Sequence, residues 1–375
     1  MQIVCYDFGL ALDLILNKIL INGRFLSRRP TGVDRVAIEV VRALDHAVEA
    51  RDPSVDGLHF EVVVPRGDVL QRFVNIPVRQ FGRLRGQAWE QIELAMLGRN
   101  GFLVNLCNTA PFFVRQQATV IHDVATEKVP ASYGRLFRTW YSLLTPALYR
   151  RSKCICTVSQ FSKSELASIY GVRDGVAVLP EGTDHMGRLA ADATVLARNG
   201  LRARPYVLAV SSLSPHKNFA AVVRAVELLG DVDFDVVVAG GQNPRVFAGA
   251  GGGLSSSVKY VGYVTDEELK ALYENAACFV FPSIYEGYGL PPTEAMACGC
   301  PVLAAGAASI PEVCGEAAIY FDPHDPSSLA AALARVMTEP LLREDLRKRG
   351  LARAGALIWR DAALELLSVI RRATA

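Results

Sequence analysis

The sequence lacks the features that mark several large classes of protein. Its 375 residues carry a net charge of only +2, whereas a protein that binds nucleic acid over much of its surface is far more basic. It contains no run of about 18 uncharged apolar residues, so no transmembrane helix is expected. The apolar residues 10–16 are interrupted by Asp13 and precede no small-residue cleavage site, unlike a secretory signal. We therefore expect a cytoplasmic protein that does not bind nucleic acid.

Disulfide bonds and metal sites are not expected either, although the sequence contains eight cysteines. Most of the cysteines lie inside apolar runs. A single residue separates Cys154 from Cys156, and a single residue separates Cys298 from Cys300. In a reducing compartment this spacing is typical of buried thiols.

What is present is the composition and pattern of an α/β protein. Hydrophobic residues make up 51% of the chain, and its length suits two domains. Short strand-like runs alternate with helical patterns, which predicts parallel sheets with right-handed crossovers. The expected strands are Ile19–Asn22, Phe60–Val64, Leu103–Leu106, Ala118–His122, Cys154–Val158, Val176–Leu179, Tyr206–Val210, Asp235–Ala239, Val258–Val261, Cys278–Phe281, Val302–Ala304 and Ala318–Phe321.

A polar stretch near residues 185–204 separates the two halves of the chain. We expect one Rossmann-like domain over residues 1–190 and a second over residues 204–355. The last helix, in residues 356–375, follows the second sheet and is expected to pack back across the first domain. Ligands of such folds bind at the carboxyl ends of the strands, so two facing domains place a site in the cleft between them.

Charge is unevenly distributed along the chain. Residues 1–200 carry a net charge of +5, and residues 201–375 carry −3. Residues 128–164 contain no acidic residue, and their basic side chains alternate with large aromatic ones. This stretch is either an amphipathic surface helix packed on a core or a patch that contacts an anionic membrane. Its basic residues include Arg135, Arg138, Arg150, Arg151, Lys153 and Lys163.

The segment from Phe281 to Pro301 is the most informative in the sequence. An apolar strand ends at Phe281, and the glycine-containing loop after it carries Glu286. Two prolines then suit the first turn of a helix, where a missing N–H costs nothing, and Glu294 falls in that turn. A glycine and a proline end the helix. Both glutamates can therefore face one ligand.

Two carboxylates beside a helix start suit a nucleotide sugar. A carboxylate accepts two hydrogen bonds from a cis-diol such as that of ribose. Free N–H groups at the helix start suit a pyrophosphate, because the neighbouring glycines let it approach the backbone. The alternative is a capped helix whose N-terminus simply favours acidic residues.

This segment, Glu286-Gly-Tyr-Gly-Leu-Pro-Pro-Thr-Glu294-Ala-Met-Ala-Cys-Gly-Cys-Pro-Val, resembles the signature of the family 4 retaining glycosyltransferases, the group 1 type, which have the GT-B fold. The resemblance extends from Thr31-Gly32-Val33 to about Ala332 and points to a mannosyltransferase-like member. It implies two Rossmann-like domains that face each other across a cleft. The first domain would bind the acceptor, and the second would bind the nucleotide sugar.

The resemblance also implies roles for residues of the signature. Glu294 would bind the ribose hydroxyls of the donor, and Glu286 would contact hydroxyls of the transferred sugar. The N–H groups of Gly289 and Leu290 would meet the sugar and the diphosphate.

Other segments resemble weaker landmarks of the same family. Lys217 matches the lysine of the diphosphate loop, where a cation stabilises the leaving group. Ser212 stands where many relatives carry an arginine, which leaves open whether a second cation holds the diphosphate. His122 would lie near the donor sugar and the acceptor, although a histidine at a strand end is often structural. Gly32 would let the diphosphate or the acceptor approach a helix start. Glu181 replaces an asparagine that relatives often have, and no role is assigned to it.

The loop containing Tyr263 and Val264 resembles the one that lines the nucleobase. Asp231 and Asp233 have the spacing found in metal-dependent glycosyltransferases. They precede a strand, however, on the side away from where ligands bind, so we interpret them as a solvated loop. No metal and no cofactor are expected, because the nucleotide sugar is itself a substrate.

The expected function is retaining transfer of a hexose from a nucleotide diphosphate sugar. GDP-mannose is the first choice of donor, and a glycan or polyprenyl-linked acceptor of bacterial polysaccharide or lipopolysaccharide biosynthesis is the first choice of acceptor. Residues 128–164 would provide peripheral contact with the inner face of the cytoplasmic membrane. The alternatives are a nucleotide-sugar epimerase, a phosphorylase-like enzyme, or a catalytically weak GT-B subunit that scaffolds a glycosyltransferase complex.

Overall fold

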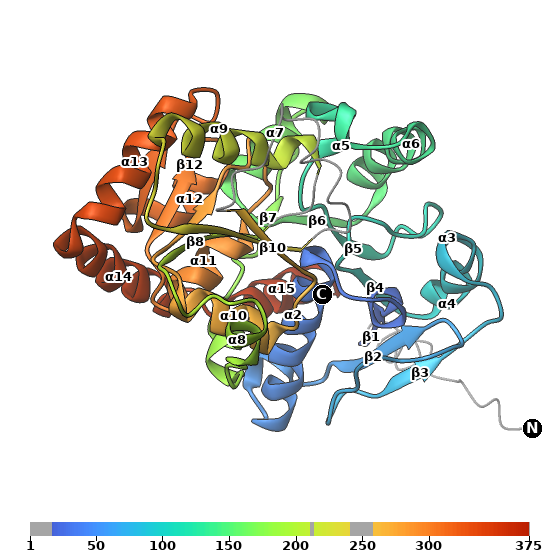
Figure 1. Cartoon of the computed structure of the whole chain (residues 1–375). Coiled ribbons are helices and arrows are strands. Elements are labelled where there is room, and N and C mark those ends of the chain that lie inside the picture. The colour runs from blue at the N-terminus through green and yellow to red at the C-terminus, as the bar shows by residue number, and fades with distance from the viewer. Residues whose placement is uncertain (1–16, 211–213, 241–257, 375) are drawn as a thin grey trace, which may run out of the picture.

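The computed structural model describes residues 17–210, 214–240 and 258–374, which form two units built around parallel β-sheets (Figure 1). The first sheet has the order β3-β2-β1-β4-β5-β6-β7, and the second has the order β10-β9-β8-β11-β12-β13. The strands of the first sheet are β1 (Lys18–Asn22), β2 (His59–Val64), β3 (Val78–Gln80), β4 (Phe102–Asn105), β5 (Gln117–Val120), β6 (Cys154–Thr157) and β7 (Ala177–Val178). Those of the second are β8 (Tyr206–Val210), β9 (Asp235–Ala239), β10 (Val258–Gly262), β11 (Cys278–Phe281), β12 (Val302–Ala305) and β13 (Ala318–Phe321).

These strands confirm the predicted fold class, two facing α/β units of GT-B type. Every predicted strand forms, with ends that differ by a few residues at most, and the neighbouring strands pair in parallel. The sequence did not predict β3, the short edge strand that pairs with β2. In each sheet the strand order reverses beside the first strand, at β1/β4 and at β8/β11. Ligands bind at such switch points in open parallel sheets.

Helices cover both faces of each sheet, which explains why the strands are continuous apolar runs. In β1, Ile19 and Ile21 belong to one core cluster, whereas Leu20 lies in another on the opposite face. The longer helices are α2 (Gly32–Glu49), α6 (Arg135–Arg151), α7 (Gln160–Tyr170), α9 (Phe219–Leu229), α10 (Asp266–Asn275), α11 (Leu290–Ala297), α13 (Pro326–Thr338), α14 (Pro340–Gly355) and α15 (Trp359–Thr374). The shorter ones are α3 (Gly86–Ala88), α4 (Ala95–Leu97), α5 (Ala125–Lys128), α8 (Thr194–Arg198) and α12 (Ile310–Cys314).

The C-terminal helix α15 returns to the first unit after the second sheet is complete. It packs against α2 (Figure 1), and its residues Trp359, Leu366 and Ile370 are buried in the same core cluster as β1. A 3-10 turn, η6 (Asp184–Arg188), lies where the chain passes from the first unit to the second. The two units are therefore joined by two crossings of the chain.

Two further expectations concern the chain as a whole. None of the helices within the described ranges is both long and apolar enough to cross a membrane. The seven cysteines among the described residues are free thiols. Cys156 and Cys300 are buried, and their neighbours Cys154 and Cys298 are half-buried.

Candidate functional site

A cavity of about 640 Å³ lies between the two units, at the carboxyl ends of their strands. Its volume is in the range of small-molecule sites. Residues from both sheets line it, just beyond the ends of β5, β6, β8, β9 and β11. They include Thr31, Gly32, Val33, His122, Asp123, Tyr133, Val158, Glu181, Val210, His216, Lys217, Gly240, Tyr263, Phe281, Tyr285, Glu286, Gly287, Tyr288, Gly289 and Leu290.

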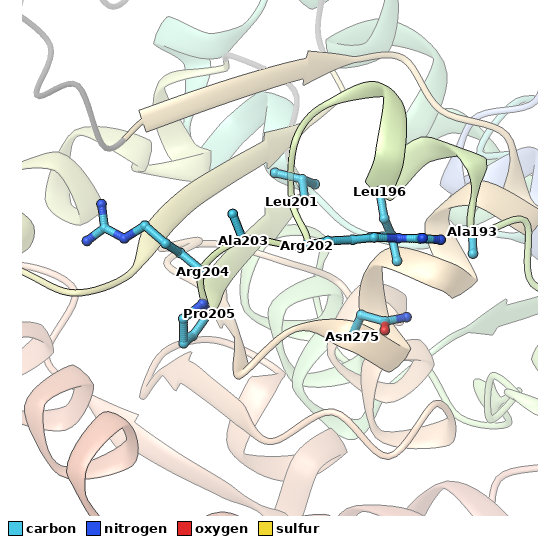
Figure 2. A pocket seen from close by; sticks show the side chains of 8 residues that line it. All are labelled: Ala193, Leu196, Leu201, Arg202, Ala203, Arg204, Pro205 and Asn275. Carbon is cyan, nitrogen blue, oxygen red and sulfur yellow. The ribbon is translucent and has the colours of Figure 1, made fainter.

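A second hollow, of about 510 Å³, lies beside the connection between the units (Figure 2). Arg202 extends along it towards Ala193 and Leu196, whereas Arg204 points the other way. None of the predicted site residues within the described ranges lines this hollow. The cavity between the sheets is therefore the candidate site.

The loop from Glu286 to Gly289 is held against the first unit. The carbonyl of Gly287 accepts hydrogen bonds from the hydroxyls of Ser159 and Ser162, at 2.6 and 3.0 Å. A Cβ atom at position 287 would lie 2.2 Å from the carbonyl oxygen of His122, so only glycine fits this contact. Gly289 has a φ of +103° and precedes α11, a conformation that favours glycine. The two glycines therefore let the loop pass close to both the first unit and the cavity.

Helix α11 presents its N-terminus to the cavity. The helix begins at Leu290, with prolines in its first turn as the sequence predicts. Proline has no N–H, so Gly289 and Leu290 carry the free N–H groups at this end. Both residues line the cavity. The helix start is thus able to bind an anion.

Lys217 and Glu286 form an ion pair within the cavity. The Lys217 Nζ atom donates to Glu286 Oε1 at 2.6 Å, and both side chains are largely but not fully buried. Lys217 ends a 3-10 turn after β8, and Glu286 lies in the loop after β11. Neighbouring strands of the second sheet thus deliver a cation and a carboxylate to one place.

His122 is buried at the cavity wall beside a second carboxylate. Its Nε2 atom lies 2.8 Å from the carbonyl oxygen of Leu106, and its Nδ1 atom lies 3.7 Å from Glu181 Oε1. A carbonyl only accepts hydrogen bonds, so Nε2 carries a proton and Nδ1 faces Glu181. Burial alone would lower the pKa of His122, but its interaction with Glu181 raises the pKa above the ordinary histidine value. Burial also raises the pKa of Glu181.

His216 and Asp123 add two more titratable groups to the cavity. The His216 Nδ1 atom is 2.9 Å from the Ser132 hydroxyl. Burial and the positive charge of Lys217 lower the pKa of His216, which favours the neutral ring. Burial raises the pKa of Asp123. Both groups line the same cavity as Lys217, and burial there shifts the pKa of each towards its neutral form.

Glu294 is buried on α11 and does not appear among the residues that line the cavity. Its Oε1 atom lies 3.0 Å from His185 Nε2, and His185 Nδ1 lies 3.1 Å from the indole nitrogen of Trp359. Glu294 therefore sits at one end of a short buried chain of hydrogen bonds. His185 occupies the turn η6, and Trp359 begins α15.

Two of the remaining predicted residues, Gly32 and Tyr263, line the cavity. Gly32 begins α2, and a Cβ atom built on it would meet nothing within 4 Å. The guanidinium of Arg29 lies 3.5 Å from the ring centre of Tyr263, which joins the two units across the rim. Val264 is half-buried against the core of the second unit and is not among the lining residues. Ser212 lies outside the described residues.

Residues 196–353 match the family model described as glycosyl transferases group 1. The chain carries a group 1 glycosyltransferase domain. The O-antigen chain mannosyltransferase B of Escherichia coli is 29% identical to this chain over an alignment of 375 positions. The alignment covers 91% of this chain and 96% of that protein. The predicted resemblance is therefore confirmed.

Solved structures support the same fold for this glycosyltransferase. The sucrose-phosphate synthase of Thermosynechococcus elongatus superposes with a TM-score of 0.75 at 20% identity, covering 95% of this chain and 98% of that one. Anabaena HepE, in complex with UDP and glucose, superposes with a TM-score of 0.73 at 16% identity, covering 95% and 99%. These likenesses concern the GT-B fold alone.

The Asp231–Asp233 pair of the glycosyltransferase lies outside the cavity. The residues precede β9 at its amino end, whereas Gly240, just after its carboxyl end, lines the cavity. Asp231 and Asp233 are exposed to solvent. Across residues 17–210, 214–240 and 258–374, no group of three or more His, Cys, Asp or Glu side chains is arranged to hold a metal ion.

Sequence reasoning missed three groups of this glycosyltransferase site. His216 directly precedes Lys217, and Glu181 follows a predicted strand end, so position along the chain could have indicated both. His185 is different, because its partners are 109 and 174 residues away. The sequence signature gives no sign of that contact.

Proposed function

We propose that this glycosyltransferase moves a hexose from a nucleotide diphosphate sugar to an acceptor hydroxyl, with retention of configuration at the anomeric carbon. The observation that carries the proposal is the Lys217–Glu286 pair beside the free N–H groups of Gly289 and Leu290. This arrangement offers a cation and backbone donors to a diphosphate, and a carboxylate to sugar hydroxyls.

The diphosphate, the transferred sugar and the base each have a matching feature in the cavity, and a carboxylate on α11 matches the ribose. Lys217 and the start of α11 would stabilise the diphosphate as it gains charge on leaving. Glu286 would accept hydrogen bonds from hydroxyls of the transferred sugar once Lys217 turns to the phosphate. Glu294, one turn into α11, would bind the ribose, and Tyr263 would lie near the base. These roles agree with the resemblance of the signature to family 4.

The transfer itself would pass through an oxocarbenium-like sugar. The bond from the anomeric carbon to the diphosphate oxygen breaks, and the bond to the acceptor oxygen forms on the same face. The acceptor proton passes to the leaving diphosphate. Neither Glu286 nor His122 is assigned as a covalent nucleophile; His122 would orient the donor sugar and the acceptor. No divalent cation takes part in this scheme, because the cavity supplies its own cation.

Mannose is the proposed sugar and GDP the proposed nucleotide. The choice of mannose rests on the Escherichia coli relative, which is named an O-antigen chain mannosyltransferase. The choice of GDP rests on the family resemblance alone. The proposed acceptor is a growing glycan or a polyprenyl-linked precursor of a surface polysaccharide, on the cytoplasmic side of the membrane. HepE was crystallised with UDP, so UDP sugars belong in any test of the donor.

We also propose that helix α6 brings the enzyme to the membrane surface. The helix lies at the periphery of the first unit (Figure 1), and its side chains Leu136 and Leu143 are 90% and 67% exposed. Arg135 and Arg138 are exposed beside them. Exposed apolar side chains flanked by arginines suit an anionic lipid surface. Arg151 does not belong to this surface, because its guanidinium stacks over the ring of Phe112.

The experiment that tests the proposed function follows the anomeric configuration of the product. The purified enzyme is incubated with GDP-mannose and a short mannan acceptor, with UDP-glucose in parallel, and the product is analysed by NMR. An α-linked product from an α-linked donor supports retention. A β-linked product from the same donor would overturn the mechanism while leaving the glycosyltransferase family intact.

A further inference from the structure

His185 connects the proposed ribose carboxylate to the C-terminal helix. The Trp359 indole N–H donates to His185 Nδ1 at 3.1 Å, and His185 Nε2 lies 3.0 Å from Glu294 Oε1. His185 is 3% exposed and Trp359 is 1% exposed, so water does not compete for these bonds. The three side chains come from η6, α15 and α11.

The hydrogen bonds fix which nitrogen of His185 carries the proton. An indole N–H only donates, so Nδ1 must accept and is unprotonated. A carboxylate accepts, so Nε2 must carry the proton and donate to Glu294. The order of donors and acceptors is therefore Trp359 to His185 to Glu294. A hydrogen bond to a charged group is among the stronger ones in a protein interior.

We propose that His185 is a positioning residue that orients the Glu294 carboxylate for the donor ribose; this rests on the proposed function of Glu294. Glu294 accepts the His185 bond at Oε1, which leaves Oε2 to accept from a ribose hydroxyl. Because His185 already holds the Glu294 carboxylate, the carboxylate adopts fewer orientations before the ribose binds. Preorganisation of this kind strengthens binding by reducing its ordering cost.

The same bonds tie Glu294 to the first unit. Trp359 is buried in the core cluster of the first sheet, whereas Glu294 belongs to α11 of the second unit. The residue before His185 strengthens the link, because Asp184 Oδ1 accepts from the Trp359 backbone N–H at 2.9 Å. The position of the carboxylate is thus set by both units at once.

The test measures how strongly the protein distinguishes a ribonucleotide from a deoxynucleotide. Calorimetric titrations use GDP and its 2′-deoxy and 3′-deoxy forms, with UDP and its deoxy forms in parallel. The wild-type protein is expected to bind one ribonucleotide about tenfold more tightly than the deoxy form that lacks the hydroxyl bound by Glu294 Oε2, as a hydrogen bond to a charged group requires. In His185→Ala this ratio is expected to fall to the level of Glu294→Gln, with the affinity for the deoxynucleotide unchanged. His185→Gln, whose amide can donate to Glu294, should restore part of the ratio.

Thr183→Val is the matched control. The Thr183 hydroxyl donates to the carbonyl of Ala354 at 3.0 Å, also in a buried site next to η6, but does not contact Glu294. The Thr183→Val variant should have a lower melting temperature but the same ratio of ribonucleotide to deoxynucleotide affinity. If His185→Ala weakens binding of ribonucleotide and deoxynucleotide equally, His185 is only structural and the proposal is overturned.

Two further measurements distinguish a failure of the proposed Glu294 role from a failure of the proposed His185 role. A wild-type protein that binds both nucleotide forms equally would overturn the role of Glu294, and the positioning proposal with it. ¹⁵N NMR of the wild-type protein can also show which ring nitrogen of His185 carries the proton. This measurement does not depend on whether a variant folds. A proton on Nε2 supports the proposal, whereas a proton on Nδ1 overturns it.

Discussion

Lys217 and Glu286 face each other in the cavity, with Lys217 Nζ 2.6 Å from Glu286 Oε1. They belong to loops that follow adjacent strands, β8 and β11, at the switch point of the second sheet. Each group offsets the charge of the other. A donor that brings both a diphosphate and sugar hydroxyls gives each of them a new partner, so the pair can separate without leaving a buried charge alone.

Lys217→Ala is expected to lower kcat more than donor affinity. The negative charge of the diphosphate peaks in the transition state, so the cation is worth most there. Loss of one such group typically costs roughly 10²-fold in kcat. Steady-state kinetics with the preferred donor would measure it, and Lys217→Arg, which keeps the charge, should retain more activity. A rise in KM with kcat intact would show that Lys217 has another role.

Glu181→Gln is expected to flatten the dependence of stability on pH. Both Glu181 and His122 have raised pKa values in the folded protein, so the folded state binds more protons than the unfolded state. Their contribution to stability is therefore fully present at low pH and is lost as pH rises. The loss begins near the ordinary glutamate pKa of 4.5 and continues above the ordinary histidine pKa of 6.5.

Melting temperatures of the wild type and Glu181→Gln, compared from pH 4.5 to above 6.5, would measure this effect. Relative to the variant, the wild type should lose stability with rising pH. His59→Gln, at an exposed position on β2, is the control and should follow the wild type. A difference between wild type and Glu181→Gln that stays constant across this range would mean that the pair does not titrate as proposed.

Activity is expected to be independent of divalent metal ions. Lys217 and the start of α11 offer positive charge to the diphosphate, and Asp231 and Asp233 lie at the opposite end of their strand from the cavity. Rates with excess EDTA should equal rates with added magnesium or manganese. Complete loss of activity with EDTA, restored by manganese, would contradict this expectation.

Binding to anionic membranes is expected to depend on the exposed face of α6. Co-sedimentation with vesicles containing phosphatidylglycerol should rise with the anionic fraction and decline as salt is added. Co-sedimentation should be abolished in a variant that combines Arg135→Glu, Leu136→Ser and Arg138→Glu. The same variant should still release nucleoside diphosphate from the donor.

The matched control for α6 lies on α14, in the second unit. Leu341 is 87% exposed there, and Arg347 and Lys348 are also exposed. The variant Leu341→Ser with Arg347→Glu and Lys348→Glu therefore makes the same change of charge elsewhere. This control variant should sediment like the wild type. Wild-type protein that stays in the supernatant with anionic vesicles at low salt would show that α6 is an ordinary surface.

Most of the fold could be predicted from the sequence, because buried parallel strands are distinctive apolar runs. It did not predict β3, since Val78–Gln80 is only three residues long, follows Pro77 and carries two polar side chains. The cluster of Lys217, Glu286, Gly289 and Leu290 was predictable, because loops after parallel strands meet at one edge of the sheet.

Contacts between residues distant in the chain could not be predicted in the same way. The bond from His185 to Glu294 depends on how the two units are placed, and that placement is not encoded in any local pattern. Arg151 illustrates the same limit within α6. Its position in a basic run suggests exposure, but the loop carrying Phe112 covers it.

Release of nucleoside diphosphate from a panel of nucleotide sugars, measured for the wild type and for Glu294→Ala, tests the central claim that the cavity binds such a donor. Removing the carboxylate should cost about 1.5–3 kcal/mol of donor binding, or roughly ten- to a hundredfold in the half-saturating concentration. The account predicts that the wild type consumes at least one donor, with GDP-mannose the first candidate, and that the variant needs correspondingly more of it. It would be contradicted if the wild type releases nothing from any member of the panel, or if a folded Glu294→Ala protein saturates at the same concentration.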